Sequence, residues 1–517
     1  MAPPPMAAES NNGAAVTAAV HPAGPHPRRR HVLLFPLPYQ GHINPMFRLA
    51  GVLHARGFAI TVFHTSFNAP DPARHPQYRF VPVPDGISGP APVAIEDVVA
   101  RIIALGPACE PAFRDRLAAV LDEYSRSGDA VACLVADAHL LPVFQVATSM
   151  ALPALALRTG SAASYACFAA YPMLCDRGYL PLVRIHDMMD AFIDSFPVFL
   201  DQQDSQLDML VPELPPYRVR DLMQLGKGGH GLIRELLARA VAAVEASSGL
   251  ILNTFDALEH GELAGIRLDL AAAVPVFDVG PLHKLSPAAG GDDISLLRQD
   301  RACLEWLDAQ PRDSVLYVSF GSLACMTPWD LAETAWGIAG SGVPFLWVVR
   351  PGLVRGACQS QHYNQQQLPE GFEAATRGRG MVVSWAPQED VLRHRAVGGF
   401  WTHNGWNSTM ESVCEGVPML CRPYFGDQPG NVRYVEHVWR VGFEVGGELE
   451  RGTVEAAIRR LMTSADGAEM RARAGELKKA AAECIGKGGS SCLAIDKLVT
   501  HIMSLDSTRG EAASFKF

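Results

Sequence analysis

The stretch HVLLFPLPYQGHINPMFRLAGVLHARGFAITVFHT (residues 31–65) decides the fold class of this chain. It opens with an apolar run, 31–38, that lacks polar alternation, as in a strand covered on both faces. Apolar residues then recur at helical spacing up to Gly57, and a second apolar run covers 58–65. A strand, a helix and a strand in this order form a βαβ unit, which predicts a parallel sheet.

The same rhythm continues on both sides of a linker. Residues 285–300 are a cluster of Pro, Ala, Gly and Asp between periodic segments, which is typical of a linker. Before it we expect helices near 95–125, 140–150 and 229–246, and strands at 131–136, 153–157 and 249–255. After it we expect strands at 315–322, 344–350, 381–387, 398–405 and 418–423. The predicted architecture is α/β: two doubly wound domains face each other across a cleft, and ligands bind at the carboxyl ends of the strands.

Composition sets the limits of these domains. Residues 1–30 are rich in Ala, Pro and polar residues, which favours a disordered tail over a plastid transit peptide. We expect an N-terminal domain at 31–284, the linker at 285–300 and a C-terminal domain at 301–485. A last helix and a tail are expected at 486–517.

The charge and cysteine patterns exclude several classes of protein. A net charge of −10 over 517 residues, without long basic tracts, argues against binding to nucleic acid. The apolar stretch 131–157 contains Asp137, Pro142 and Pro153, so we expect no insertion into a membrane. The eleven cysteines include no CxxC pair, which is typical of reduced thiols in a cytoplasmic protein.

The densest group of chemically useful residues lies at 385–428, WAPQEDVLRHRAVGGFWTHNGWNSTMESVCEGVPMLCRPYFGDQ. A predicted strand here runs through a small-residue turn into a helix, and a helix N-terminus binds anions. The turn could instead be only a capped helix with buried aromatic residues. We favour a diphosphate site because polar groups gather at these strand ends. His403, Asn407 and Ser408 supply donors, Trp385 can stack on a base, Glu411 can accept ribose hydroxyls, and Asp427 and Gln428 suit sugar hydroxyls.

A candidate general base lies in the N-terminal half. His42 follows the first strand, before a helix that Asn44 and Pro45 are expected to open. Imidazole ordinarily titrates near pH 6.5, which suits a base at neutral pH. Asp137 follows strand 131–136, where a carboxylate can hold the far imidazole nitrogen and stabilise the protonated ring. A capping or packing role is the alternative for each residue.

The segment 385–428 resembles the signature box of plant family 1 UDP-dependent glycosyltransferases, which act on secondary products. The resemblance extends from about residue 30 to about residue 500 and includes QGHINP, LVADA, YVSFGS and FLWVVRP. Within the family the chain is most similar to grass benzoxazinoid and phenolic glucosyltransferases. Within the box it rests on Trp385, Ala386, Pro387, Gln388, His403, Gly405, Trp406, Asn407, Ser408, Glu411, Gly416, Pro418, Asp427 and Gln428.

The resemblance implies a GT-B fold of two Rossmann-like domains, with a last helix that crosses back to the first. It implies inverting transfer of glucose from UDP-glucose to a hydroxyl of a flavonoid or other phenolic, a hydroxamic acid or a hormone. No metal and no further cofactor are implied, and we expect a monomer. Asn404 stands where many relatives have Cys, which we expect to be harmless.

The resemblance also implies roles for individual residues. It makes His42 the base and Asp137 its partner. Trp385 and Ala386 would hold uracil, and Gln388 and Glu411 the ribose. The diphosphate would be bound by Ser322, His403, Asn407 and Ser408; glucose by Trp406 through its backbone, Asp427 and Gln428; and Thr159 would touch the sugar or phosphate side. Gln428 at the end of the box favours glucose over galactose.

The acceptor pocket is expected to come from the least patterned loops, 85–100, 160–200 and 220–230. Phe168, Tyr171, Phe192 and Phe196 are candidates there, with a core role as the alternative.

Two other functions fit the sequence less well. A nicotinamide oxidoreductase needs a glycine-rich fingerprint after the first strand, and FPLPYQGHINP lacks it. A catalytically silent sugar-nucleotide or small-molecule binder would tolerate loss of the His42–Asp137 pair, and both residues are present.

Overall fold

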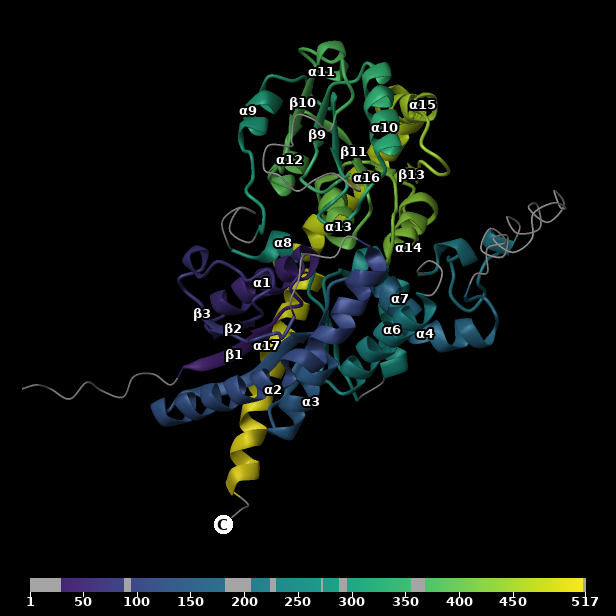
Figure 1. The fold of residues 1–517 in the computed structure, drawn as a ribbon. Coiled ribbons are helices and arrows are strands. Elements are labelled where there is room, and N and C mark those ends of the chain that lie inside the picture. The colour runs from purple at the N-terminus through teal and green to yellow at the C-terminus, as the bar shows by residue number, and fades with distance from the viewer. Residues whose placement is uncertain are drawn as a thin grey trace, which may run out of the picture.

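The computed structural model describes residues 29–87, 94–181, 206–223, 229–270, 273–287, 295–354 and 368–514. In these residues the chain forms two parallel sheets, one in each half (Figure 1). Of the predicted acceptor aromatics, Phe192 and Phe196 lie outside the described residues. The predicted domain limits remain a proposal.

The first sheet has the strand order β3-β2-β1-β4-β5-β6-β7. Its strands are β1 (Arg30–Phe35), β2 (Ala59–His64), β3 (Arg79–Pro82), β4 (Ala130–Asp137), β5 (Ala154–Arg158), β6 (Leu250–Leu252) and β7 (Val276–Asp278). Its helices are α1 (Gln40–Ala55), α2 (Ile95–Ser127), α3 (Leu141–Ser149), α4 (Ala162–Asp176), α6 (His230–Glu245), α7 (Asp256–Leu270) and α8 (Leu282–Leu285), with short turns η1 (Pro72–Arg74) and η3 (Val219–Asp221). The central strands are buried on both faces, as their unbroken apolar sequence predicts.

The second sheet has the order β10-β9-β8-β11-β12-β13. Its strands are β8 (Val315–Ser319), β9 (Phe345–Val348), β10 (Gly380–Val383), β11 (Val397–Thr402), β12 (Met419–Cys421) and β13 (Gly442–Glu444). Its helices are α9 (Ala302–Asp308), α10 (Pro328–Ser341), α11 (Phe372–Ala375), α12 (Gln388–Arg393), α13 (Trp406–Glu415), α14 (Gln428–Arg433), the π-helical turn η6 (Tyr434–Val438), α15 (Arg451–Thr463) and α16 (Ala465–Ile485). The prediction of two doubly wound α/β units is confirmed.

The strand orders place a switch point in each sheet. Chain order reverses direction between β1 and β4 in the first sheet, and between β8 and β11 in the second. The loops after two such strands leave the sheet on opposite faces, which opens a crevice at their carboxyl ends. The residues that follow these four strands are therefore the first place to look for a site.

Helix α17 (Ser490–Ser514) returns to the first sheet after the second is complete. Figure 1 shows it, in yellow, running from the second unit along the first. Its residues Ala494, Ile495, Leu498 and Ile502 are buried in one apolar cluster with β1, β2, β4 and α1. None of the described helices is long and apolar enough to cross a bilayer.

Two local predictions differ from the structure. Helix α1 begins at Gln40 with Tyr39 as its N-cap, so Pro45 lies inside the helix and Asn44 does not cap it. Pro45 is the sixth residue of the helix and leaves the Gly41 carbonyl without an intrahelical donor, and Asn407 donates to that oxygen instead. Strands β3, β7 and β13 were also not predicted; each has three or four residues and lies at a sheet edge.

Candidate active site

A cavity of about 320 Å³ lies between the carboxyl ends of the two sheets. Residues from both halves of the chain form its wall, and they include those that follow the four strands at the switch points. Of the predicted site residues, the wall contains His42, Thr159, Ser322, Trp385, Ala386, Gln388, His403, Trp406, Asn407, Ser408, Glu411, Asp427 and Gln428. Asp137 is the exception because it lies directly behind His42.

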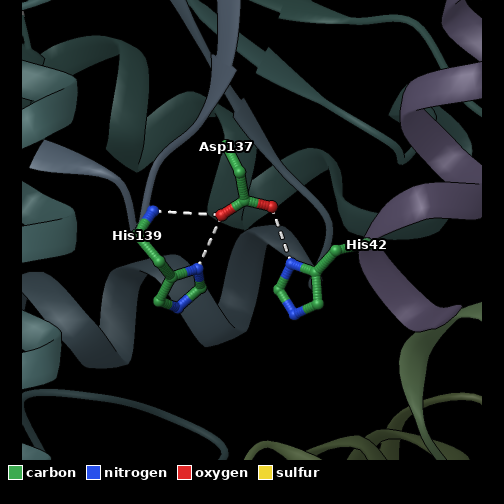
Figure 2. A group of neighbouring side chains, drawn as sticks. All are labelled: His42, Asp137 and His139. Atoms are coloured by element: carbon green, nitrogen blue, oxygen red, sulfur yellow. Dashed lines mark hydrogen bonds and ion pairs between the residues drawn. The ribbon is translucent and has the colours of Figure 1, made fainter. Parts of the chain in front are cut away.

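His42 and Asp137 form a hydrogen-bonded pair at the switch point of the first sheet (Figure 2). His42 lies in the first turn of α1, and its Nδ1 is 2.7 Å from Oδ2 of Asp137, the last residue of β4. A carboxylate only accepts hydrogen bonds, so Nδ1 of His42 carries the proton and Nε2 has the lone pair. The Thr159 hydroxyl, just beyond β5, is 3.0 Å from the same Nδ1. His42 is thus oriented from two strands, with Nε2 left for a substrate proton.

The second oxygen of Asp137 has donors of its own. Oδ1 accepts the backbone N–H of His139 at 3.0 Å, and the His139 ring Nδ1 lies 2.8 Å from it, as Figure 2 shows. Burial raises the pKa of Asp137, but the charges and hydrogen bonds of His42 and His139 outweigh it and hold this pKa well below its ordinary value. The side chain is only 1% exposed, so a buried carboxylate stays ionised beside His42.

His139 and Arg158 are the residues of this network that the sequence analysis missed. Arg158 ends β5, and its Nη1 lies 3.3 Å from Nε2 of His139. The sequence did contain an indication of both residues. His139 comes two positions after Asp137 and Arg158 ends an apolar strand, so both are expected at the same sheet edge. Sequence spacing alone did not show that they meet.

One side of the cavity, which we call the donor wall, consists of Ser322 and the lining residues between 385 and 428. It is built around the N-terminus of α13. The chain leaves β11 through His403 and through Asn404 at φ 60°, a left-handed conformation that asparagine tolerates. The ring of His403 packs so closely on Gly321, at φ 69°, that a Cβ there would lie 2.5 Å from it. Only glycine fits this contact. The free N–H groups of α13 therefore open on the cavity next to Ser322 and His403.

Three polar side chains of this wall hold one another. The Gln388 amide donates to the Ser408 hydroxyl at 2.9 Å and to the Glu411 carboxyl at 2.7 Å. Burial, and then the charge of neighbouring Glu389, raise the pKa of Glu411 to about 8. Trp385 is oriented by a 3.1 Å hydrogen bond from its Nε1 to the Ser295 hydroxyl. A flat ring and a polar rim thus stand side by side, as a nucleoside requires.

Further along the wall, Asp427 and Gln428 begin α14. The Gln428 side-chain oxygen accepts the backbone N–H groups of Tyr424 and Phe425, at 2.7 and 3.1 Å. Its amide nitrogen is thereby the part that can face a ligand. Asp427 is half-buried, and its Oδ2 accepts a hydrogen bond from Asn431 at 3.2 Å.

Several contacts join the donor wall to the first half of the chain, among them an ion pair between Arg48 and Glu389 at 2.6 Å. Trp406 donates its Nε1 hydrogen to the Asn253 carbonyl at 2.8 Å. Asn407 donates to the Gly41 carbonyl at 2.9 Å, an oxygen that α1 leaves free because Pro45 has no N–H to offer it. The donor wall is therefore positioned directly against the turn that bears His42.

The acceptor side of the cavity is apolar. Its wall comes from α2, α4 and α6 and the segment before α6, and it contains Ile95, Val98, Val99, Ile102, Phe168, Met223, Ile233 and Leu236. Phe168 therefore lines the pocket as predicted. Tyr171 is 2% exposed and packs in a core cluster away from the cavity wall, so its alternative core role is the one observed.

His42, Asp137 and His139 also bring one potential metal-ligand atom each within 4.8 Å of one another. Their hydrogen bonds give a different account of this cluster. Both ring Nδ1 atoms face carboxylate oxygens at hydrogen-bond distance and carry protons, so neither offers a lone pair to a cation. We therefore describe the group as a hydrogen-bonded His–Asp–His cluster.

Fold and site together define a GT-B sugar-nucleotide transferase, and comparison with known proteins agrees. The family model for UDP-glucuronosyl and UDP-glucosyl transferases matches residues 289–469. The DIMBOA UDP-glucosyltransferase BX8 of Zea mays is 49% identical over 470 residues, 89% of this chain and 96% of the relative. BX9 of Zea mays, also a DIMBOA UDP-glucosyltransferase, is 48% identical over 459 residues, 88% and 92% of the two chains.

Among solved structures, a UDP-glucosyltransferase from Polygonum tinctorium capable of glucosylating indoxyl, in complex with 3,4-dichloroaniline, has a TM-score of 0.73 and 28% identity. The match covers 92% of this chain and 99% of that one. Os79 from O. sativa, in complex with UDP, matches with a TM-score of 0.73 and 27% identity over 91% of this chain and all of that one. The chain belongs to the family of UDP-dependent glycosyltransferases, enzymes that transfer a sugar from a UDP-sugar.

Proposed function

We propose that this enzyme transfers glucose from UDP-glucose to a hydroxyl of a small plant metabolite, with inversion at the sugar carbon and without a metal. One observation carries the proposal. A histidine whose Nε2 is free to accept a proton lies in the same cavity as the anion-binding N-terminus of α13. Such an arrangement places a base on one side of a bound sugar and the leaving group on the other.

In this mechanism Nε2 of His42 takes the proton from the acceptor hydroxyl as its oxygen attacks C1 of the sugar. The bond from C1 to the diphosphate oxygen breaks, and UDP leaves. Asp137 stabilises the imidazolium that forms. The N–H groups of α13 stabilise the charge that grows on the departing diphosphate.

The donor contacts are those that the family resemblance implies, and they are assigned to residues that line the cavity. Trp385 and the Ala386 backbone would hold uracil, and Gln388 with Glu411 the ribose. Ser322, His403, Asn407 and Ser408 would hold the diphosphate. Glucose would be bound by the Trp406 backbone, Asp427, Gln428 and Thr159, which all line the same cavity as His42.

For the acceptor we propose an aromatic or heteroaromatic compound with an acidic hydroxyl. The apolar wall suits a flat ring, and the two maize relatives are named for DIMBOA, which favours a benzoxazinoid hydroxamic acid over a flavonoid or a hormone. We further propose that the enzyme is a cytoplasmic monomer.

The test is release of UDP from UDP-glucose with a panel of benzoxazinoid hydroxamic acids, flavonoids and plant hormones. We expect turnover with at least one panel member, and a higher kcat/KM for UDP-glucose than for UDP-galactose when the two compete. His42→Ala is the control for background hydrolysis. Transfer of galactose as fast as glucose would overturn the donor assignment, and UDP release that does not depend on an acceptor would overturn transfer.

A further inference from the structure

Arg158 lies beside the His42–Asp137 pair and has no part in the mechanism described so far. It is 3% exposed although it borders the cavity. Its Cζ lies 4.2 Å from the centre of the Phe168 ring, which supports the guanidinium from one face. Its Nη1 is directed at Nε2 of His139, 3.3 Å away. Burying a guanidinium costs free energy, so its fixed position beside the His42–Asp137 pair suggests a function.

This contact fixes the protonation state of His139. A guanidinium has donors only, so Nε2 of His139 must be the acceptor and carries no proton. The proton of the neutral ring is then on Nδ1, which donates to Oδ1 of Asp137. Burial lowers the pKa of His139 to about 4; Asp137 opposes this shift, and Arg158 and His42 add to it.

The protonation state of His139 determines how strongly the negative charge of Asp137 can stabilise protonated His42. With His139 neutral, Oδ1 receives two uncharged donors, the backbone N–H and Nδ1–H. The negative charge of Asp137 then remains uncompensated until His42 takes up the substrate proton. A protonated His139 would balance that charge from the other side, and His42 would lose the support that makes it a base.

We propose that Arg158 and His139 are positioning residues that hold Asp137 by Oδ1 and reserve its negative charge for His42 over the working pH range. This role rests on the proposed function of His42 as the base. Arg158 acts on His139, His139 on Asp137, and Asp137 on His42. Figure 2 shows the last two steps of this series.

Other charged and titratable groups surround the series. His139 faces Asp137 from β4, His42 from α1 and Arg158 from β5. Arg158 in turn is close to Asp427, at the start of α14, and to Tyr165 of α4. Its Nε has no hydrogen-bond partner among the described residues. Because Asp427 also lies near, Arg158 could serve the sugar site instead, and the experiment separates the two roles.

The first experiment measures kcat/KM for the acceptor against pH. In Arg158→Met, His139 loses the positive donor that keeps its Nε2 unprotonated, so its pKa rises, although burial, the largest cause of the low pKa, remains. We expect the acid limb of the pH profile, the fall of kcat/KM at low pH, to move to higher pH. At pH 6 kcat/KM should be lower than that of the wild type by about tenfold or more, and at pH 8 by less than about threefold. Arg158→Lys keeps a positive donor and should keep the limb near its wild-type position.

The decisive variant is the double change Arg158→Met with His139→Asn. It removes the imidazole that titrates, and the acid limb should return to the wild-type position. Arg239→Met is the matched control, because Arg239 reaches the Ile103 carbonyl of α2 outside this series and should leave the limb in place. If the double variant keeps the shifted limb, or Arg158→Met weakens UDP-glucose binding without moving it, Arg158 serves the donor site and the proposal is wrong.

A second experiment needs no activity. In protein labelled with ¹⁵N-histidine, the resonance lost in His139→Asn identifies His139. We expect a neutral ring with the proton on Nδ1 from pH 5.5 to 8 in the wild type, and protonation within this range in Arg158→Met. A proton on Nε2 or an imidazolium in the wild type at pH 7 would overturn the proposal. Absence of glucose transfer by the wild type would instead refute the proposed function, and this measurement would still decide the state of His139.

Discussion

The two walls of the cleft are built in different ways. Most of the donor wall comes from one stretch, 385–428, and its groups include a helix N-terminus, neutral side chains and the carboxyls of Glu411 and Asp427, whose pKa values are raised by burial. On the facing wall the reactive groups come from α1, β4 and β5, and they include an ionised buried carboxylate and a buried guanidinium. One wall binds a leaving group, and the other handles a proton.

This difference teaches which changes should affect which step. Variants of the proton-handling wall should lower kcat and alter its pH dependence, while binding of UDP stays the same. Variants of the donor wall should change the affinity for UDP. Each prediction below tests whether the two walls really act independently.

The largest effect is expected for His42→Ala. Loss of a general base usually lowers kcat by about 10²–10⁴-fold. An acceptor with a more acidic hydroxyl needs less help and should lose less. Binding of UDP-glucose, measured by calorimetry, should stay at the wild-type value. Near wild-type turnover with the less acidic acceptor would remove His42 from the mechanism, and lost donor binding would move it to the donor wall.

Asp137→Asn should follow, with a loss in kcat of about 10²-fold or more but smaller than that of His42→Ala. The change keeps the size of the side chain and removes the charge that stabilises the imidazolium. The measurement is kcat with the same two acceptors, together with a melting temperature to confirm folding. A loss confined to KM for UDP-glucose would contradict the separation of the walls.

A moderate effect of pH is expected on the affinity for UDP. The Glu411 pKa of about 8 leaves most of this carboxyl protonated at pH 7, while two ribose hydroxyls are best accepted by the ionised form. The affinity for UDP should therefore rise by about tenfold between pH 7 and pH 9, as the competent fraction grows. Calorimetry should find no such rise in Glu411→Gln. An equal slope in both proteins would assign the pH dependence to another group.

The smallest effect, none at all, is expected for chelation. The proposed phosphate contacts are backbone N–H groups and neutral side chains, which need no cation between them and the diphosphate. Turnover after dialysis against EDTA should equal that of untreated enzyme. A loss that Mn²⁺ or Mg²⁺ restores would show that the donor wall works with a metal.

Much of this site could be predicted because its parts are local in the sequence. The strand–turn–helix pattern of 398–415 and the apolar run 31–38 are each contained in one short segment, so two doubly wound units could be predicted, with His42 and Asp137 at strand ends. The strand orders, and with them the switch points, come from the structure. Arg158 and His139 could not be paired in this way. Their contact depends on side-chain directions at two adjacent strand ends, which periodicity does not report.

The predicted start of α1 was wrong because it, too, depends on contacts between distant segments. Asn44 and Pro45 carry the usual sequence signs of a helix start, yet the helix begins at Gln40. A tertiary contact stabilises the observed first turn, since Asn407 of the opposite wall donates a hydrogen bond to the Gly41 carbonyl. Edge strands such as β3 and β13 were missed because their few residues form a strand only through pairing with a neighbour.

The return of α17 to the first sheet gives the protein an order of assembly during its synthesis. Domains generally fold as they leave the ribosome, the N-terminal one first. Here the helix that packs on β4 and β7 is translated only after the whole second sheet. The first sheet therefore leaves the ribosome with an apolar face uncovered, and a truncated polypeptide that ends before residue 490 would keep it exposed. Docking of the last helix is thus the step that completes the core of the first sheet.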